Sequence, residues 1–103
     1  MQKARFFPGE LVHHKLFDYR GVVVDVDPVF QGTEEWYRQM ARSNPPLDEP
    51  WYHVLVHNAA HNTYVAERNL ESDDSGESIN HPLLASIFST LENGVYVKRS
   101  KSN

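Results

Sequence analysis

The chain has 103 residues and a formal net charge of −4, with 10 Lys and Arg against 14 Asp and Glu, and it contains no cysteine. This length suits one domain with a modest core, and the lack of cysteine excludes disulfides, thiolate metal sites and thiol nucleophiles. A dedicated DNA-binding domain usually carries a basic face, so in this acidic chain such a face must be local.

The sequence predicts a cytoplasmic protein. Residues 1–8 form a segment that is too short and too quickly polar for a signal peptide. The longest apolar run, residues 21–24, is far shorter than a membrane span.

Residues 11–17 predict a first strand, and residues 18–21 a turn. A second strand over residues 22–26 is rich in β-branched side chains and ends at Asp27-Pro28, because proline has no amide hydrogen to donate. Simple alternation divides this strand between two faces: Val22, Val24 and Val26 on one, Val23, Asp25 and Asp27 on the other.

Residues 31–50 form an insertion that contains a short helix. Thr33 is the expected N-cap, acidic residues follow it in the first turn, and the helix is predicted to run to about Arg42. Pro45 and Pro46 then force an extended passage back to the sheet.

The next predicted elements follow one another closely. Residues 51–57 form a third strand, residues 58–62 a hairpin loop, and residues 63–66 a fourth strand. Residues 67–70 form a turn or a single 3₁₀ turn, and residues 71–78 form a solvated acidic loop.

A C-terminal helix is predicted to begin at Asn80, with Pro82 tolerated in its first turn, and to end at Gly94. Its apolar stripe consists of Leu83, Leu84, Ile87, Phe88 and Leu91. Residues 95–97 allow a last short strand, and residues 98–103 form a basic, frayed tail.

Together these elements predict a mainly β fold: a small SH3-like β-barrel with a short helical insertion and a C-terminal helix. An open antiparallel sheet packed on the two helices is the alternative. We expect one domain over residues 1–103, with its core at about 6–97.

Catalytic and metal-binding patterns are weak. His13 and His14 face opposite sides of a strand, and His53, His57 and His61 lie near strand ends, where surface histidines are common; we predict no metal site. The pair Asp25 and Asp27 shares a strand face, but a solvated strand end explains it. With neither a glycine-rich phosphate loop nor a nucleophile elbow, the sequence predicts a protein that binds, without catalysis or a cofactor.

Two kinds of side chain are candidate contacts for a macromolecular partner. The aromatic residues Trp36 and Tyr37 lie in the insertion, where they either cover the barrel or stack on a partner, and Tyr19 lies in a turn. The cationic candidates, which suit phosphate or carboxylate, are Arg5, Lys15, Arg20, Lys98, Arg99 and Lys101.

Several ordered segments resemble one family. They are residues 7–14, residues 17–28, residues 50–56, residues 63–70 with the sequence TYVAERNL, and residues 80–84 with Phe88 and residues 94–96. In this order they resemble the heat-shock protein HspQ family, also called the YccV-like or hemimethylated DNA-binding domain. The resemblance covers residues 6–97. Asp18 is a departure, because glycine is expected there as often as aspartate.

The resemblance implies an SH3-like barrel in a bacterial cytoplasmic heat-shock protein that serves protein quality control. It implies a role as an adaptor or specificity enhancer of the ATP-dependent protease Lon, promoting degradation of proteins such as the replication initiator DnaA. Binding to hemimethylated DNA is the alternative that it implies, and a homo-oligomer, such as a trimer, is a further one. The resemblance assigns no role to a particular residue.

Overall fold

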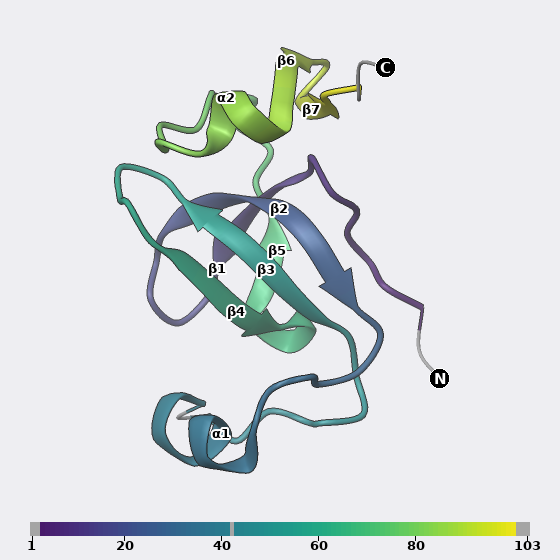
Figure 1. The fold of residues 1–103 in the computed structure, drawn as a ribbon, viewed down its shortest axis with the longest axis vertical. Helices are drawn as coiled ribbons and strands as arrows, with labels where there is room; N and C mark the ends of the chain where they lie inside the picture. Colours follow the sequence, from purple (N-terminus) through teal and green to yellow (C-terminus); the bar gives the residue numbers. More distant parts are fainter. Residues whose placement is uncertain (1–2, 42, 101–103) are drawn as a thin grey trace.

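The computed structural model describes residues 3–41 and 43–100 and is mainly β. Figure 1 shows the sheet at the centre, α1 at one end and α2 with β6 and β7 at the other. The elements are β1 (Leu11–His14), β2 (Arg20–Asp27), α1 (Glu34–Met40), β3 (Trp51–Val56), β4 (Asn62–Ala66), the 3₁₀ helix η1 (Glu67–Asn69), β5 (Leu70–Ser72), α2 (Leu84–Ile87), β6 (Phe88–Glu92) and β7 (Val95–Lys98).

Five strands form one antiparallel sheet in the order β4-β3-β2-β1-β5. Its edge strands, β4 and β5, do not pair with each other, so hydrogen bonds do not close the described sheet into a barrel. The first four predicted strands are confirmed, although β1 ends at His14 instead of residue 17. The predicted acidic loop is wrong at its start, because β5 pairs with β1. With three residues, only Leu70 of them buried, β5 is too short to show alternation.

A β-bulge in β2 changes which side chains share a face. The register with β3 shifts between Val23 and Asp25. Val26 therefore packs against the same buried cluster as Val23, whereas Val22 packs with Val24. The prediction that Val26 faces the same way as Val22 is wrong, because the extra bulge residue reverses the alternation that follows it.

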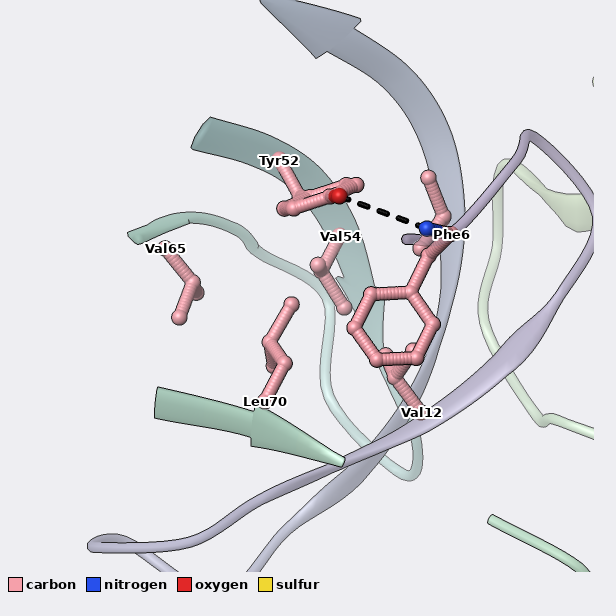
Figure 2. Packing of buried hydrophobic residues seen from close by; sticks show 7 residues of the cluster. Phe6, Val12, Tyr52, Val54, Val65 and Leu70 are labelled. Atoms are coloured by element: carbon pink, nitrogen blue, oxygen red, sulfur yellow. Dashed lines mark hydrogen bonds between the residues drawn. The ribbon is translucent and has the colours of Figure 1, made fainter. Parts of the chain in front are cut away.

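Both faces of the sheet are buried, because neighbouring side chains of its strands alternate between two core clusters. On one face the core cluster, shown in Figure 2, contains Phe6, Val12, Val23, Tyr52, Val54, Val65 and Leu70. On the other face the cluster contains Leu11, Val22, Leu55, Ile79, Phe88 and Tyr96. Val22 and Val23 are both fully buried, which confirms the prediction that this strand begins buried on both sides.

The predicted long C-terminal helix is wrong. Helix α2 spans only Leu84–Ile87, and the chain then forms the β6–β7 hairpin. The turn explains the difference, because Asn93 and Gly94 both adopt positive φ, of 53° and 78°, and Asn-Gly favours a tight hairpin turn. Four residues of the predicted apolar stripe still pack in one cluster, namely Leu84, Ile87, Phe88 and Leu91, whereas Leu83 is 45% exposed.

Asn80 does not cap a helix, which corrects the predicted start. Its amide N–H donates to Nδ1 of His57 at 2.8 Å, and its carbonyl accepts from the amide of Asn58 at 2.8 Å. Asn80 thus joins the loop after β5 to the loop after β3, while Leu83 occupies the N-cap position of α2.

The insertion helix is confirmed. The Thr33 hydroxyl accepts from the amide of Trp36 at 3.1 Å, and α1 ends at Met40; Arg42 lies outside the described residues. No helix in the described part of the chain combines the length and the apolar character that crossing a membrane requires.

A glycine joins the sheet to the C-terminal hairpin. The amide of Gly9 donates to the carbonyl of Val23 and its carbonyl accepts from the amide of Tyr96, both at 2.8 Å. Gly9 has a φ of 100°, and a Cβ there would lie 2.2 Å from the carbonyl oxygen of Tyr96, so a larger residue cannot fit without displacing β7.

A buried polar group holds the N-terminal segment against the core. The Tyr52 hydroxyl donates to the Glu67 carboxylate at 2.5 Å, and the amide of Arg5 donates to the same carboxylate at 2.8 Å. The Tyr52 oxygen also accepts from the amide of Phe6 at 3.3 Å, the bond drawn in Figure 2. Burial, together with the Glu67 carboxylate, raises the pKa of Tyr52 to about 12.

We predict that Glu67→Ala lowers the free energy of unfolding by roughly 1–3 kcal/mol, because the buried Tyr52 hydroxyl loses its acceptor and the Arg5 amide keeps only the Tyr52 oxygen, at 3.0 Å. Glu67→Gln keeps an acceptor and should cost less. Urea denaturation measures both, with exposed Glu77→Ala as the control, expected within about 0.5 kcal/mol of the native chain. Equal losses for Glu67→Ala and Glu77→Ala would show that this contact does not anchor the segment.

Candidate functional site

A groove of about 600 Å³ lies along β4. Its floor includes every residue of β4. One wall comes from the turn between β1 and β2, and the other from Trp36 and Met40 of α1 with the residues that follow. Among the described lining residues there is no Asp, Glu, Lys or Arg, although the chain as a whole is acidic. The groove is therefore an apolar feature on an otherwise charged domain.

The first wall is the turn that joins β1 to β2. Leu16 and Phe17 line the groove with 57% and 62% of their surface exposed. The Tyr19 hydroxyl lies 2.7 Å from the hydroxyl of Thr63, which fixes the turn against β4. His14, which is buried, stacks on Phe17 with 4.6 Å between ring centroids, so the exposed phenyl ring rests on a fixed surface.

The second wall is the insertion. Trp36 and Met40 line the groove, and Met40 is 60% exposed. Trp36 is held by neighbouring aromatic rings, with centroids 5.6 Å from Tyr64 and 6.1 Å from Trp51. Of the two predicted roles, the structure shows that the half-buried Trp36 ring packs on the sheet; the ring also lines the groove, and contact with a partner stays a prediction.

Tyr37 has a structural role in the same wall. Its hydroxyl donates to the carbonyl of Pro45 at 2.6 Å, and its ring contacts Phe30 edge-on. Tyr37 does not line the groove, so it positions the insertion and is not a direct contact in this groove.

Behind the groove, Asp27 joins three strands. Its carboxylate accepts from the Tyr64 hydroxyl at 2.6 Å and lies 3.1 Å from Nε2 of His53. Burial, together with the bond to Asp27, raises the pKa of Tyr64. Asp25, Asp27 and His53 have possible metal-ligand atoms within 4.8 Å of one another, so His53 lies beside two carboxylates.

His13 makes contacts with two carboxylates that join the turn between β1 and β2 to β5. The two ring nitrogens of His13 lie 2.6 Å from the carboxylate of Asp18 and 2.7 Å from that of Glu71. Asp18 has a φ of 56°, the left-handed conformation that glycine adopts without strain, which explains why glycine was expected there. His13 thus links the turn to β5.

The cationic candidates near the N-terminus do not converge. Arg5 is exposed, with its guanidinium 5.3 Å from the centroid of the Phe6 ring. Lys15 is exposed in the turn, whereas Arg20 donates to Asp73 at 2.6 Å and to the carbonyl of Glu77 at 2.6 Å. Arg20 therefore fixes the acidic loop and is not free to bind a partner.

The structure describes residues 98–100 of the predicted basic tail, and Arg99 makes hydrogen bonds there. Lys98 ends β7 and is exposed. Arg99 donates from Nε to the carbonyl of Ala85 at 2.9 Å, and its amide donates to Ile87 at 2.8 Å, so its side chain closes the end of α2. Lys101 lies outside the described residues.

Tyr19 and Trp36, which the sequence predicted as candidate contacts, line the groove. The sequence analysis did not name four other lining residues as candidates: His14, Leu16, Phe17 and Met40. Residues 16 and 17 were assigned to a strand, where apolar residues signal a core. The following Asp18-Tyr19-Arg20-Gly21 turn was the available signal, because an apolar pair at the tip of a turn has no sheet to cover.

We predict that His13 makes stability depend on pH. Hydrogen bonds to Asp18, then to Glu71, raise the pKa of His13 above 6.5 in the folded chain. Its stabilisation is therefore fully present below pH 6.5 and is lost as the pH rises through the raised pKa.

Urea denaturation at a series of pH values, from slightly acidic to alkaline, measures the free energy of unfolding of the native chain and of His13→Gln. The quantity of interest is the difference between the two at each pH. The difference should be larger on the acidic side, and Asp18→Asn should reduce this trend. A difference that does not change with pH would contradict the assignment.

Comparison with known families adds one finding. The model of the family described as hemimethylated DNA-binding protein YccV like matches residues 4–95, which span every strand of the five-stranded sheet and reach the start of β7. This range agrees with the resemblance found in the ordered segments. The chain belongs to the YccV-like family.

Proposed function

We propose that this protein is a cytoplasmic heat-shock adaptor that brings unfolded proteins to an ATP-dependent protease of the Lon type. The groove along β4 carries the proposal, because Leu16, Phe17 and Met40 remain more than half exposed on both of its walls. Exposed apolar side chains grouped in a concave site are typical of surfaces that bind other proteins. The protein acts through this surface and not by catalysis; DnaA is one expected client.

The fold suits this role. Edge strands β4 and β5 are joined by the single 3₁₀ turn η1, and both contribute to one core cluster through Val65 and Leu70. We infer that the sheet curls in the manner of an SH3-like barrel that stays open between β4 and β5. Such an opening leaves β4 accessible beside the groove.

The test is degradation of reduced, carboxymethylated α-lactalbumin, a permanently unfolded protein, by purified Lon. We expect the native chain to increase the rate and the double variant Leu16→Ser/Met40→Ser to lose most of the increase. The matched control is Leu47→Ser/Leu83→Ser, since these leucines are 48% and 45% exposed but do not line the groove. No increase with the native chain would refute the adaptor function, and equal losses in both double variants would remove the groove from it.

DNA binding is the second candidate, favoured by the description of the family. The exposed cations Arg5, Lys15 and Lys98 would provide phosphate contacts. We expect Arg5→Ala/Lys15→Ala to weaken binding to a hemimethylated duplex and to reduce its dependence on salt concentration, measured by fluorescence anisotropy. Equal affinity for unmethylated and hemimethylated duplexes would exclude a methylation-specific role.

A further inference from the structure

We propose that the groove binds an extended segment of an unfolded polypeptide as an additional β-strand on β4, and that Nε2 of His14 donates a hydrogen bond to a carbonyl of that segment. The inference rests on the proposed function, since it specifies how the adaptor holds its client.

The open edge of β4 provides the main-chain partner. The amide of Glu67 donates to the carbonyl of Pro50 at 3.0 Å, and the register pairs Tyr52 with Val65 and Val54 with Thr63. In an antiparallel ladder, bonded pairs alternate, so Val65 and Thr63 direct their amides and carbonyls to β3. Asn62, Tyr64 and Ala66 then direct theirs away from β3, toward the side where the described sheet has no further strand. Ala66 is only 1% exposed, so Asn62 and Tyr64 are the accessible positions.

The groove lies on this open edge. It is lined by all five consecutive residues of β4, from Asn62 to Ala66. Neighbouring side chains of a strand point to opposite faces, so a groove that touches every one of them must reach the edge of the strand, although Trp51 and His53 of β3 also line it. An extended chain in the groove would therefore meet the amides and carbonyls of Asn62 and Tyr64.

His14 supplies an independent sign of a ligand. It is 4% exposed and lines the groove. Its Nδ1 accepts from the amides of Leu16 and Phe17 at 3.1 and 3.0 Å, so a neutral ring carries its proton on Nε2. Burial lowers the pKa of His14, which favours the neutral ring. Among the described residues, Nε2 has no hydrogen-bond partner, and a peptide carbonyl is the acceptor that it suits.

The walls indicate the side chains that the added strand would carry. One set of alternate residues would meet Leu16 and Phe17, and the other set would meet Trp36 and Met40. No described lining residue carries a full charge of either sign apart from protonated histidine, so the groove favours apolar side chains over the phosphates of DNA. Unfolded proteins expose such segments, whereas folded proteins bury them.

Binding is tested with a fluorescein-labelled peptide of about twelve residues with valine at alternate positions and serine or threonine between them. Its matched control has the same side chains, with N-methyl groups on the alternate amides of one edge, which prevents strand pairing on that edge; a second control methylates the other edge. We expect the unmethylated peptide and only one of the two methylated peptides to bind. Equal binding by all three would refute strand addition.

Amide hydrogen exchange locates the bound peptide. The amides of Asn62 and Tyr64 should exchange rapidly in the free protein and become protected when the peptide is bound, whereas Thr63 and Val65 should be protected in both states. Protection that appears only at β5, or at both odd and even residues of β4, would contradict the proposed edge. Peptide-independent protection of Tyr64 that grows with protein concentration would instead identify a second copy of the chain as the occupant.

His14→Asn tests the side-chain contact. Asparagine places an oxygen near the position of Nδ1 and so keeps the acceptor for Leu16 and Phe17, but it has no donor at the position of Nε2. We expect peptide affinity to fall about three- to tenfold. The matched control is His57→Asn, because His57 also accepts an amide with Nδ1 but lies outside the groove. An unchanged affinity in His14→Asn would remove the histidine from the proposal.

Normal peptide binding with no stimulation of protease would refute only the adaptor function, whereas stimulation without peptide binding would refute only strand addition.

Discussion

The contact between Tyr52 and Glu67 determines how the other parts of the domain meet. Glu67 begins the 3₁₀ turn between β4 and β5, Tyr52 lies in β3, and their partner amides at Arg5 and Phe6 belong to the N-terminal segment. One buried carboxylate thus links the first residues of the described chain to the place where the sheet turns from one edge strand to the other. Because the group is buried and hydrogen-bonded, it cannot be lost without leaving donors unsatisfied.

The same contact has a bearing on the groove. The turn that Glu67 begins follows directly after Ala66, the last residue of β4, and Asn69 at its end accepts from the amide of Lys15 at 2.8 Å. The floor of the groove and its first wall are therefore both tied to this turn. Exposed Leu16, Phe17 and Met40 can stay on a fixed surface because the polar contacts beneath them, and not their own burial, hold the walls in place.

Much of the fold could be predicted from local chemistry. Thr33 and the acidic residues after it define the start of α1, and runs of β-branched residues define β2 and β3. The errors arise where tertiary context or turn chemistry decides. The β2 bulge reverses the direction of Val26, and Asn93-Gly94 makes a hairpin of a stripe that also fits helical spacing. Apolar Leu16 and Phe17 were assigned to a strand, because only the turn that follows them indicated that they have no sheet to cover.

A free strand edge set between two walls also controls what can approach it. The edge of another sheet brings neighbouring strands and attached loops with it, so it would have to pass the turn between β1 and β2 and the insertion, which both line the groove. A single unfolded strand is narrow enough to enter. The groove would thus distinguish unfolded from folded chains by their thickness, and the same walls protect β4 from the edge-to-edge pairing that leads exposed sheets to aggregate.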